Sequence, residues 1–329
     1  MATNQTQVLP AGPQKLNISQ KWAEVYLFQM KRIWKHLPES IRRLAVGQMY
    51  GRHLHARVRL HAERKQYFGT FFLRNRAELE LMRRILDRKP RNSSLQMAVL
   101  ACSKGAEVYS VVWTIRAARP DLRLNMRAVD ISQEVLQFAE KGVYSRNGRD
   151  VPGSPEQAEV VPGGDMTWRD QPLSIFERMT GAEVEAMFEV EDDQARIRPW
   201  LKEGISWLRG DASDPEFAAA QGPQDIVVAN RFLCHMRPPA AEKCLRNITR
   251  LVKPGGYLFV SGVDLDVRTK VAREMGWEPV YDLIREVHEG DPSLLRGWPL
   301  EYWGLEPFRD DRPGWKIRYA AVFQIGSAA

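Results

Sequence analysis

Residues 95–131 read as a strand, a turn, a helix and a second strand, and this order constrains the fold more than any other feature of the sequence. Apolar residues 95–100 predict the first strand, small residues 101–105 the turn, and residues 106–119 the helix. The second strand ends on Asp130, which can accept hydrogen bonds from ribose hydroxyls, while the small turn lets a ligand approach the backbone. The sequence therefore predicts a doubly wound α/β domain that binds an adenosine-containing cofactor.

The turn also indicates which cofactor fits. A dinucleotide-binding turn needs three glycines in the pattern Gly-x-Gly-x-x-Gly to approach a pyrophosphate. Only Gly105 is present here. A cofactor without phosphates is therefore favoured, and S-adenosylmethionine is such a cofactor.

The same residues carry a resemblance to a known family. Ala-Cys-Ser-Lys-Gly-Ala-Glu-Val-Tyr-Ser at 101–110 resembles the Gly-Cys-Ser-x-Gly-Glu-Glu-Pro-Tyr-Ser signature of CheR-type methyltransferases. Ala-Val-Asp-Ile-Ser at 128–132, Thr-Phe-Phe-Leu-Arg-Asn at 70–75 and the Lys-Pro-Gly-Gly turn within 251–259 are similar to further motifs of that family. The resemblance spans roughly residues 67–262. It implies a class I fold, S-adenosylmethionine as cofactor and S-adenosylhomocysteine as product, and esterification of glutamates on bacterial chemoreceptors.

The carboxyl ends of parallel strands converge on one crevice, so the turns after four predicted strands should form the cofactor site. The resemblance implies that Glu107 helps to hold the amino acid end of the cofactor. Asp211 could accept a hydrogen bond from the adenine amino group. The predicted cofactor-binding residues are Ala101, Cys102, Ser103, Gly105, Glu107, Asp130, Ile131, Asp211, Ala212 and Asn230.

The predicted catalytic residues are Arg74, Arg231 and His235, and two of them depart from the family. Where the family reads Cys-Arg-Asn-x-x-Ile-Tyr-Phe, residues 229–236 read Ala-Asn-Arg-Phe-Leu-Cys-His-Met. A carboxylate acceptor is already ionised and needs only an arginine and a hydrogen-bond donor, whereas a hydroxyl or an amine is helped by a base. His235 could be that base. No metal site is expected, because Cys234 and His235 lack further ligands.

Length and pattern divide the chain into regions. We expect a disordered lead over residues 1–16, a helical domain over 17–90 and a cofactor-binding catalytic domain over 91–329. The helical domain should hold helices to about Leu37, over 39–66 and over 77–88. The catalytic domain should carry an insertion at about 145–203, where the family has a small antiparallel receptor-docking subdomain, and an extension from about 263. Its sheet should be mostly parallel, with an antiparallel last strand over 315–325.

Composition limits location and partners. No apolar run approaches the length that spans a bilayer, and the first residues lack the blocks of a signal peptide, so we expect a cytoplasmic protein without membrane insertion. Residues 1–91 hold 19 lysines and arginines against 6 acidic residues. A basic segment like this can contact an acidic partner, but without a recognition motif nucleic acid is not expected, and a solvated helical surface explains the charge equally well.

Three functions remain open. The first is methyl transfer to an oxygen or nitrogen of a small-molecule acceptor, as the altered Asn230–Arg231 pair and His235 suggest. The aromatic stretch 298–308 could line a pocket for such an acceptor, or it could simply pack on the sheet. The second is glutamate methylation on a chemoreceptor or another protein. The third is a regulator that binds S-adenosylmethionine without turnover.

Overall fold

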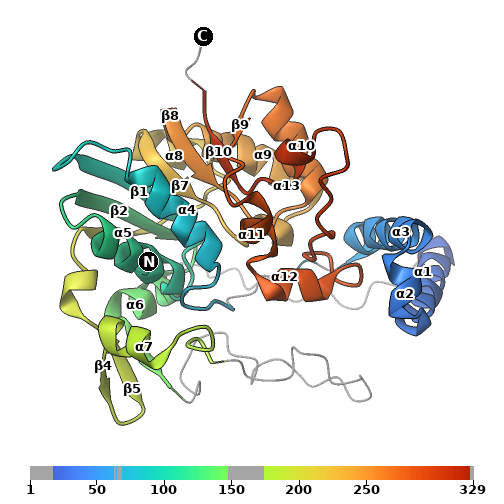
Figure 1. Ribbon diagram of the computed structural model, residues 1–329, viewed down its shortest axis with the longest axis horizontal. Coiled ribbons are helices and arrows are strands. Elements are labelled where there is room, and N and C mark those ends of the chain that lie inside the picture. The colour runs from blue at the N-terminus through green and yellow to red at the C-terminus, as the bar shows by residue number, and fades with distance from the viewer. Residues whose placement is uncertain (1–17, 63, 65–68, 147–173, 327–329) are drawn as a thin grey trace, which may run out of the picture. The chain divides into compact units, whose positions relative to one another are not determined.

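The computed structural model describes residues 18–62, 64, 69–146 and 174–326. The described chain divides into two compact units (Figure 1). The smaller holds residues up to 62 together with 298–302, and the larger holds residues 63–297 and 303–329. The lead predicted over residues 1–16 lies outside the described residues. Among the described helices, none has the length and apolar character required to cross a bilayer.

A seven-stranded sheet forms the centre of the larger unit, with the strand order β6-β2-β1-β7-β8-β10-β9. The strands β6, β2, β1, β7 and β8 are parallel, and β10 pairs antiparallel with both β8 and β9. The predicted α/β fold with a mostly parallel sheet and an antiparallel last strand is therefore confirmed. The strands are β1 (Ser94–Leu100), β2 (Arg123–Asp130), β6 (Ile205–Arg209), β7 (Gln224–Val228), β8 (Val252–Phe259), β9 (Glu278–Pro279) and β10 (Val322–Gln324).

Both faces of this sheet are buried. Along β1, Leu95, Met97 and Val99 pack into one core, while Ala98 and Leu100 pack into a second core on the opposite face. Such a doubly covered strand needs apolar residues at every position, which is why residues 95–100 are mostly apolar. Outside the insertion, the described α-helices of this unit are α4 (Arg76–Leu86), α5 (Ala106–Ala118), α6 (Gln133–Lys141), α8 (Pro215–Gln221), α9 (Pro238–Thr249), α10 (Leu265–Glu274), α11 (Ile284–Glu289), α12 (Pro292–Gly297) and α13 (Trp315–Tyr319).

A second, three-stranded sheet lies in the region of the expected insertion. Its strands are β3 (Val143–Ser145), β4 (Phe188–Glu191) and β5 (Gln194–Ile197), and they pair antiparallel in the order β3-β5-β4. The helix α7 (Gly181–Met187) precedes β4 and begins with a capping box between Thr180 and Glu183. Residues 147–173 of the insertion lie outside the described residues.

The prediction of one strand over 315–325 is wrong in its first half. Residues 315–319 form α13, and only 322–324 join the sheet. The side chain of Tyr319 is fully buried, and its hydroxyl donates to Glu306 Oε1 at 2.9 Å. This tertiary contact stabilises a helical turn that the alternating pattern of the sequence does not reveal.

The smaller unit contains α1 (Ile18–His36), α2 (Glu39–Arg43) and α3 (Ala45–His61). The helix predicted over 39–66 is two helices, because Leu44 between them has an extended backbone. Within this unit, Trp34 meets Trp298 edge to face with ring centroids 5.4 Å apart. The third predicted helix corresponds to α4, which belongs to the larger unit.

Candidate functional site

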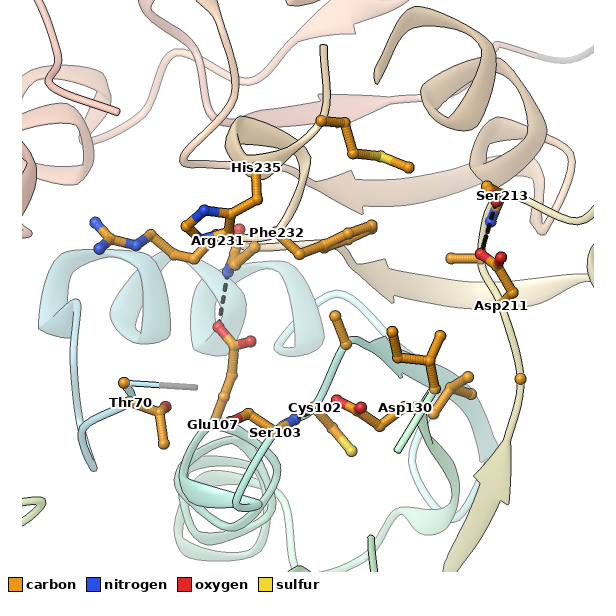
Figure 2. A pocket seen from close by; sticks show the side chains of 18 of the residues that line it. Thr70, Cys102, Ser103, Glu107, Asp130, Asp211, Ser213, Arg231, Phe232 and His235 are labelled. Carbon is orange, nitrogen blue, oxygen red and sulfur yellow. Dashed lines mark hydrogen bonds between the residues drawn. The ribbon is translucent and has the colours of Figure 1, made fainter. Parts of the chain in front are cut away.

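A cavity of about 270 Å³ opens at the carboxyl ends of β1, β2, β6 and β7. All of the predicted site residues except Gly105 line it. In Figure 2, Asp211 and Ser213 lie at one side, Cys102, Ser103 and Asp130 in the middle, and Thr70, Glu107, Arg231 and His235 at the other side. The lining residues are Gly69, Thr70, Arg74, Ala101, Cys102, Ser103, Glu107, Val129, Asp130, Ile131, Gly210, Asp211, Ala212, Ser213, Asn230, Arg231, Phe232, His235 and Met236.

The turn between β1 and α5 is tied to the end of β2. Ala101 and Ser103 both have left-handed backbones, with φ of 52° and 49°. Asp130 holds this strained turn, because its Oδ2 accepts from the Ser103 backbone N–H at 2.9 Å and its Oδ1 accepts from that of Ser132 at 3.0 Å. A residue other than glycine in this conformation persists only where its surroundings hold it. Asp130 therefore shapes the turn, and its side chain lies at the cavity wall.

Gly105 acts by packing and does not reach the cavity. It has φ of 83°, and a Cβ there would lie 3.0 Å from the Ala139 side chain and 3.2 Å from that of Trp207. The glycine lets α5 begin close to α6 and β6, so it shapes the site without lining it.

A second carboxylate closes the other side of the cavity. Asp211 Oδ1 accepts from both the backbone N–H and the hydroxyl of Ser213, at 2.8 and 2.7 Å. The preceding Gly210 donates its N–H to the Asp130 backbone carbonyl at 3.0 Å. These contacts hold the loop after β6 next to the end of β2.

Asn230 is used within the protein rather than toward the cavity. Its Nδ2 donates to Glu107 Oε1 at 2.8 Å and to Glu78 Oε1 at 2.7 Å, and its Oδ1 accepts from the N–H and the hydroxyl of Ser261, both at 2.8 Å. An amide offers two N–H donors and one oxygen with two lone pairs, so these contacts satisfy the side chain completely. Asn230 therefore positions Glu107 at the cavity wall.

Three arginines gather at the same side as Glu107. Asp291, from the segment before α12, bridges two of them: its Oδ1 lies 3.0 Å from Arg178 Nη2 and its Oδ2 lies 3.1 Å from Arg231 Nη1. Arg178 also donates to the Arg74 backbone carbonyl at 2.7 Å. Burial and the nearby Arg231 lower the pKa of Arg74 to about 10, which leaves it charged at neutral pH. Three arginines face the two carboxylates Asp291 and Glu107, so this side of the cavity keeps an excess of positive charge that can attract an anion.

His235 lies beside this cluster, in the 3₁₀ turn Leu233–His235. Arg64 holds the turn by donating to the carbonyls of Cys234 and Met236 at 2.9 and 2.6 Å. Burial, with the charges of Arg231 and Arg64, lowers the pKa of His235 to about 4. The imidazole is therefore neutral near pH 7, but it is a weaker base than an ordinary histidine.

Several residues of the site were not predicted. The sequence pattern could have indicated Glu78, because it lies on the apolar face of α4 together with Leu81, Met82 and Ile85, where a charged residue is unusual. No feature of the sequence indicated Asp291, since it lies in the extension beyond the residues that resemble the CheR-type family. Within the aromatic stretch, residues 303–308 belong to the larger unit and do not line the cavity, so they do not form the acceptor pocket that is one of the two alternatives for this stretch.

Comparison with known proteins identifies the segment that forms this cavity. Residues 69–157 match the model of the CheR methyltransferase, SAM binding domain, and residues 170–260 match a methyltransferase domain model. The probable biofilm formation methyltransferase WspC of Pseudomonas aeruginosa is 22% identical over 60% of this chain, and that of Pseudomonas putida is 24% identical over 63%. The matched region spans 40% and 42% of those relatives.

Solved structures also align with the chain. Magnesium protoporphyrin IX methyltransferase from Synechocystis PCC 6803 with bound SAM is 12% identical, with a TM-score of 0.34, over 82% of this chain and 90% of that chain.

Proposed function

Because the chain is an S-adenosylmethionine-dependent methyltransferase with a CheR-type cofactor-binding segment, we propose that it esterifies a carboxylate. The observation that carries this proposal is the arginine cluster beside a histidine whose pKa is about 4. Among the oxygen and nitrogen acceptors that the sequence leaves open, this arrangement favours a carboxylate oxygen.

The cavity residues suit S-adenosylmethionine along its length. Asp211 would accept from the adenine amino group, Asp130 would accept from the ribose hydroxyls, and Glu107 would face the α-ammonium group of the amino acid end. The bound cofactor supplies a methyl group on a sulfonium carbon. Asn230 would contribute by holding Glu107, since its own amide is fully used.

The acceptor side would work by positioning and charge. Arg74 and Arg231 would bind the acceptor carboxylate, which is ionised near neutral pH and needs no base. Asp291 and Arg178 would keep Arg231 in place. Neutral His235 would hydrogen-bond the acceptor instead of taking a proton from it. Orienting a nucleophile in this way supplies much of what a direct displacement requires.

A small-molecule acceptor in the cytoplasm is our first candidate, because the altered Asn230–Arg231 order and His235 separate this acceptor side from the family motif. A protein glutamate is the second. The observation that favours it is the β3-β5-β4 sheet, which lies where CheR-type enzymes carry their receptor-docking subdomain.

The two candidates separate in one experiment. The full chain is incubated with methyl-labelled S-adenosylmethionine and a bacterial cell extract divided by ultrafiltration into small molecules and macromolecules. Labelling in the small-molecule fraction supports the first candidate, and labelling of protein supports the second. An Arg74→Met variant is expected to lose at least 100-fold of either signal, since one charged contact is worth several kcal/mol at a buried site. Equal labelling by this variant would contradict the proposed role of Arg74.

A further inference from the structure

Two glutamates, the buried Glu78 and the partly exposed Glu107, share one amide in the wall of the cavity. Glu78, on α4, and Glu107, on α5, each accept one N–H of Asn230, at 2.7 and 2.8 Å. Figure 2 shows the Glu107 side chain rising from its helix toward this amide, with the hydrogen bond drawn as a dashed line. Glu78 is 5% exposed. Both carboxyl groups therefore lie within hydrogen-bond distance of one nitrogen, and that of Glu78 is shielded from bulk water.

The surroundings hold Glu78 in this place. Asn75 caps α4 by accepting from the Glu78 backbone N–H at 3.2 Å, and its side chain also donates to the Val287 carbonyl at 2.8 Å. Ser261 occupies the oxygen of Asn230 and so fixes the direction in which its N–H groups point. The glutamates cannot separate without breaking the cap or the amide contacts.

The hydrogen bonds available to the pair do not satisfy two carboxylates. Within the described part of the chain, the buried Glu78 Oε2 has no hydrogen-bond partner. Leaving a buried ionised oxygen without a donor is costly, whereas a protonated carboxyl avoids most of that cost. Burial and the neighbouring Glu107 accordingly raise the pKa of Glu78 to about 8, and burial raises that of Glu107.

The charged groups that face the pair come from four other elements. Arg74, in the linker before α4, and Arg231, after β7, favour ionised carboxylates, and Asp291, before α12, opposes them. Arg268, on α10, is near enough to Glu78 for the two charges to interact. Asp291 is already paired with Arg231. The net effect of these charges does not offset the rise that burial causes in the pKa of Glu78.

We propose that the pair of Glu78 and Glu107 carries one proton in the free protein and releases it when the α-ammonium group of the cofactor's amino acid end binds beside Glu107. The O–H bond of the Glu78 carboxyl breaks, the proton passes to the solvent, and the second negative charge of the pair compensates the α-ammonium group, which S-adenosylmethionine and S-adenosylhomocysteine both carry. This inference rests on the placement of the cofactor's amino acid end at Glu107 in the proposed function. Glu78 is thus a positioning and charge-balancing residue that acts through Glu107 and Asn230.

Calorimetric titration of the full chain with S-adenosylhomocysteine counts the proton. At pH 7 the same titration is run in phosphate and in Tris, whose ionisation enthalpies differ, so the difference in heat gives the protons released per ligand. We expect about one proton at pH 7, and an affinity that rises about tenfold between pH 6 and pH 7. Glu78→Gln keeps the amide contact but cannot titrate, so its release should fall below about a third of a proton.

A matched control lies on the same helix. Glu80 is paired with Arg83 and Arg84 on the more exposed face of α4, and Glu80→Gln should release as many protons as the unaltered chain. Normal binding with no proton release would overturn this inference and leave the proposed cofactor site standing. Absence of binding would overturn the proposed function and this inference together. If Glu78→Gln does not fold, the dependence of affinity on pH in the unaltered chain decides, and a flat profile from pH 6 to 7 refutes the shared proton.

Discussion

Asp291 should contribute more to the stability of the larger unit than any exposed acidic residue. Its side chain is 4% exposed and lies between Arg178 and Arg231, and its Oδ1 also accepts from Ser293 N at 3.1 Å and Ser293 Oγ at 2.6 Å. Asp291→Asn keeps the size of the side chain but removes the charge, so two guanidinium groups would face each other without it. Breaking a buried ion pair in this way costs about 3–5 kcal/mol.

The pKa of Asp291 gives a second estimate of how much its charge contributes to the free energy of unfolding. Burial opposes ionisation, but Arg231, Arg74 and Arg178 outweigh it and lower the pKa to about 2. The unfolded pKa is about 3.9, so the ionised form contributes roughly 2–3 kcal/mol of stability above pH 4. Because the folded pKa is the lower one, this contribution is lost as the pH falls from 4 toward 2. The two magnitudes agree in order.

Urea unfolding followed by circular dichroism at pH 7 measures the change. Asp291→Asn is expected to lower the free energy of unfolding by about 3–5 kcal/mol. The matched control is Asp310→Asn, because Asp310 pairs with Arg285 at 3.3 Å but its side chain is 63% exposed. It should cost less than about 1 kcal/mol. Equal losses for the two variants would refute the argument that Asp291 balances buried arginines.

Three further predictions concern the cavity. Asp130→Ala should weaken calorimetric binding of S-adenosylhomocysteine at least tenfold, since it removes the acceptor that holds Ser103 N, and unchanged affinity would contradict the ribose placement. The folded pKa of His235 is about 4, below its ordinary value, so neutral His235 should contribute up to about 3 kcal/mol of stability above pH 6.5, and this contribution should disappear as the pH falls toward 4. The free energy of unfolding in urea should therefore depend less on acid pH in His235→Gln than in the unaltered chain. Identical pH profiles of the two proteins would contradict the burial of His235 as a neutral ring. In Gly262→Ala the new Cβ would lie 2.8 Å from Arg231 Cδ, so thermal unfolding should reveal a loss about 1–3 kcal/mol larger than in Gly276→Ala, which has a similar φ and open space; equal losses would show that the close approach is harmless.

The parts of the site that the sequence predicted are those set by local order along the chain. A strand followed by small residues places Cys102 and Ser103 at a carboxyl edge, and parallel strands bring Asp130, Asp211 and Asn230 to the same edge. Only the direction of β strands and the length of the turns are needed for this inference. The same logic does not tell a lining residue from a packing one, which is why Gly105 was included.

The parts that were missed depend on contacts between distant segments. Asp291 meets Arg231 across 60 residues, and Glu78 meets Asn230 across 152 residues. The swapped order of Asn230 and Arg231 is visible in the sequence, but the direction of each side chain is not. Arg231 has a left-handed backbone, with φ of 64°, which a neighbouring Gly262 accommodates. The helical turn at 315–319 was missed for the same reason, since the contact of Tyr319 with Glu306 is tertiary.

If the chain transfers the methyl group to a carboxylate, the product is a methyl ester, and its lability in alkali distinguishes it from other methylated products. The chain is incubated with methyl-labelled S-adenosylmethionine and cell extract, and the products are then treated with mild alkali. Esters hydrolyse to volatile methanol, whereas methylated amines and ethers keep their label. We expect most of the transferred label to become volatile, and we expect the Arg74→Met variant to produce almost no volatile label. Label that stays in the alkali-treated product would contradict the carboxylate acceptor.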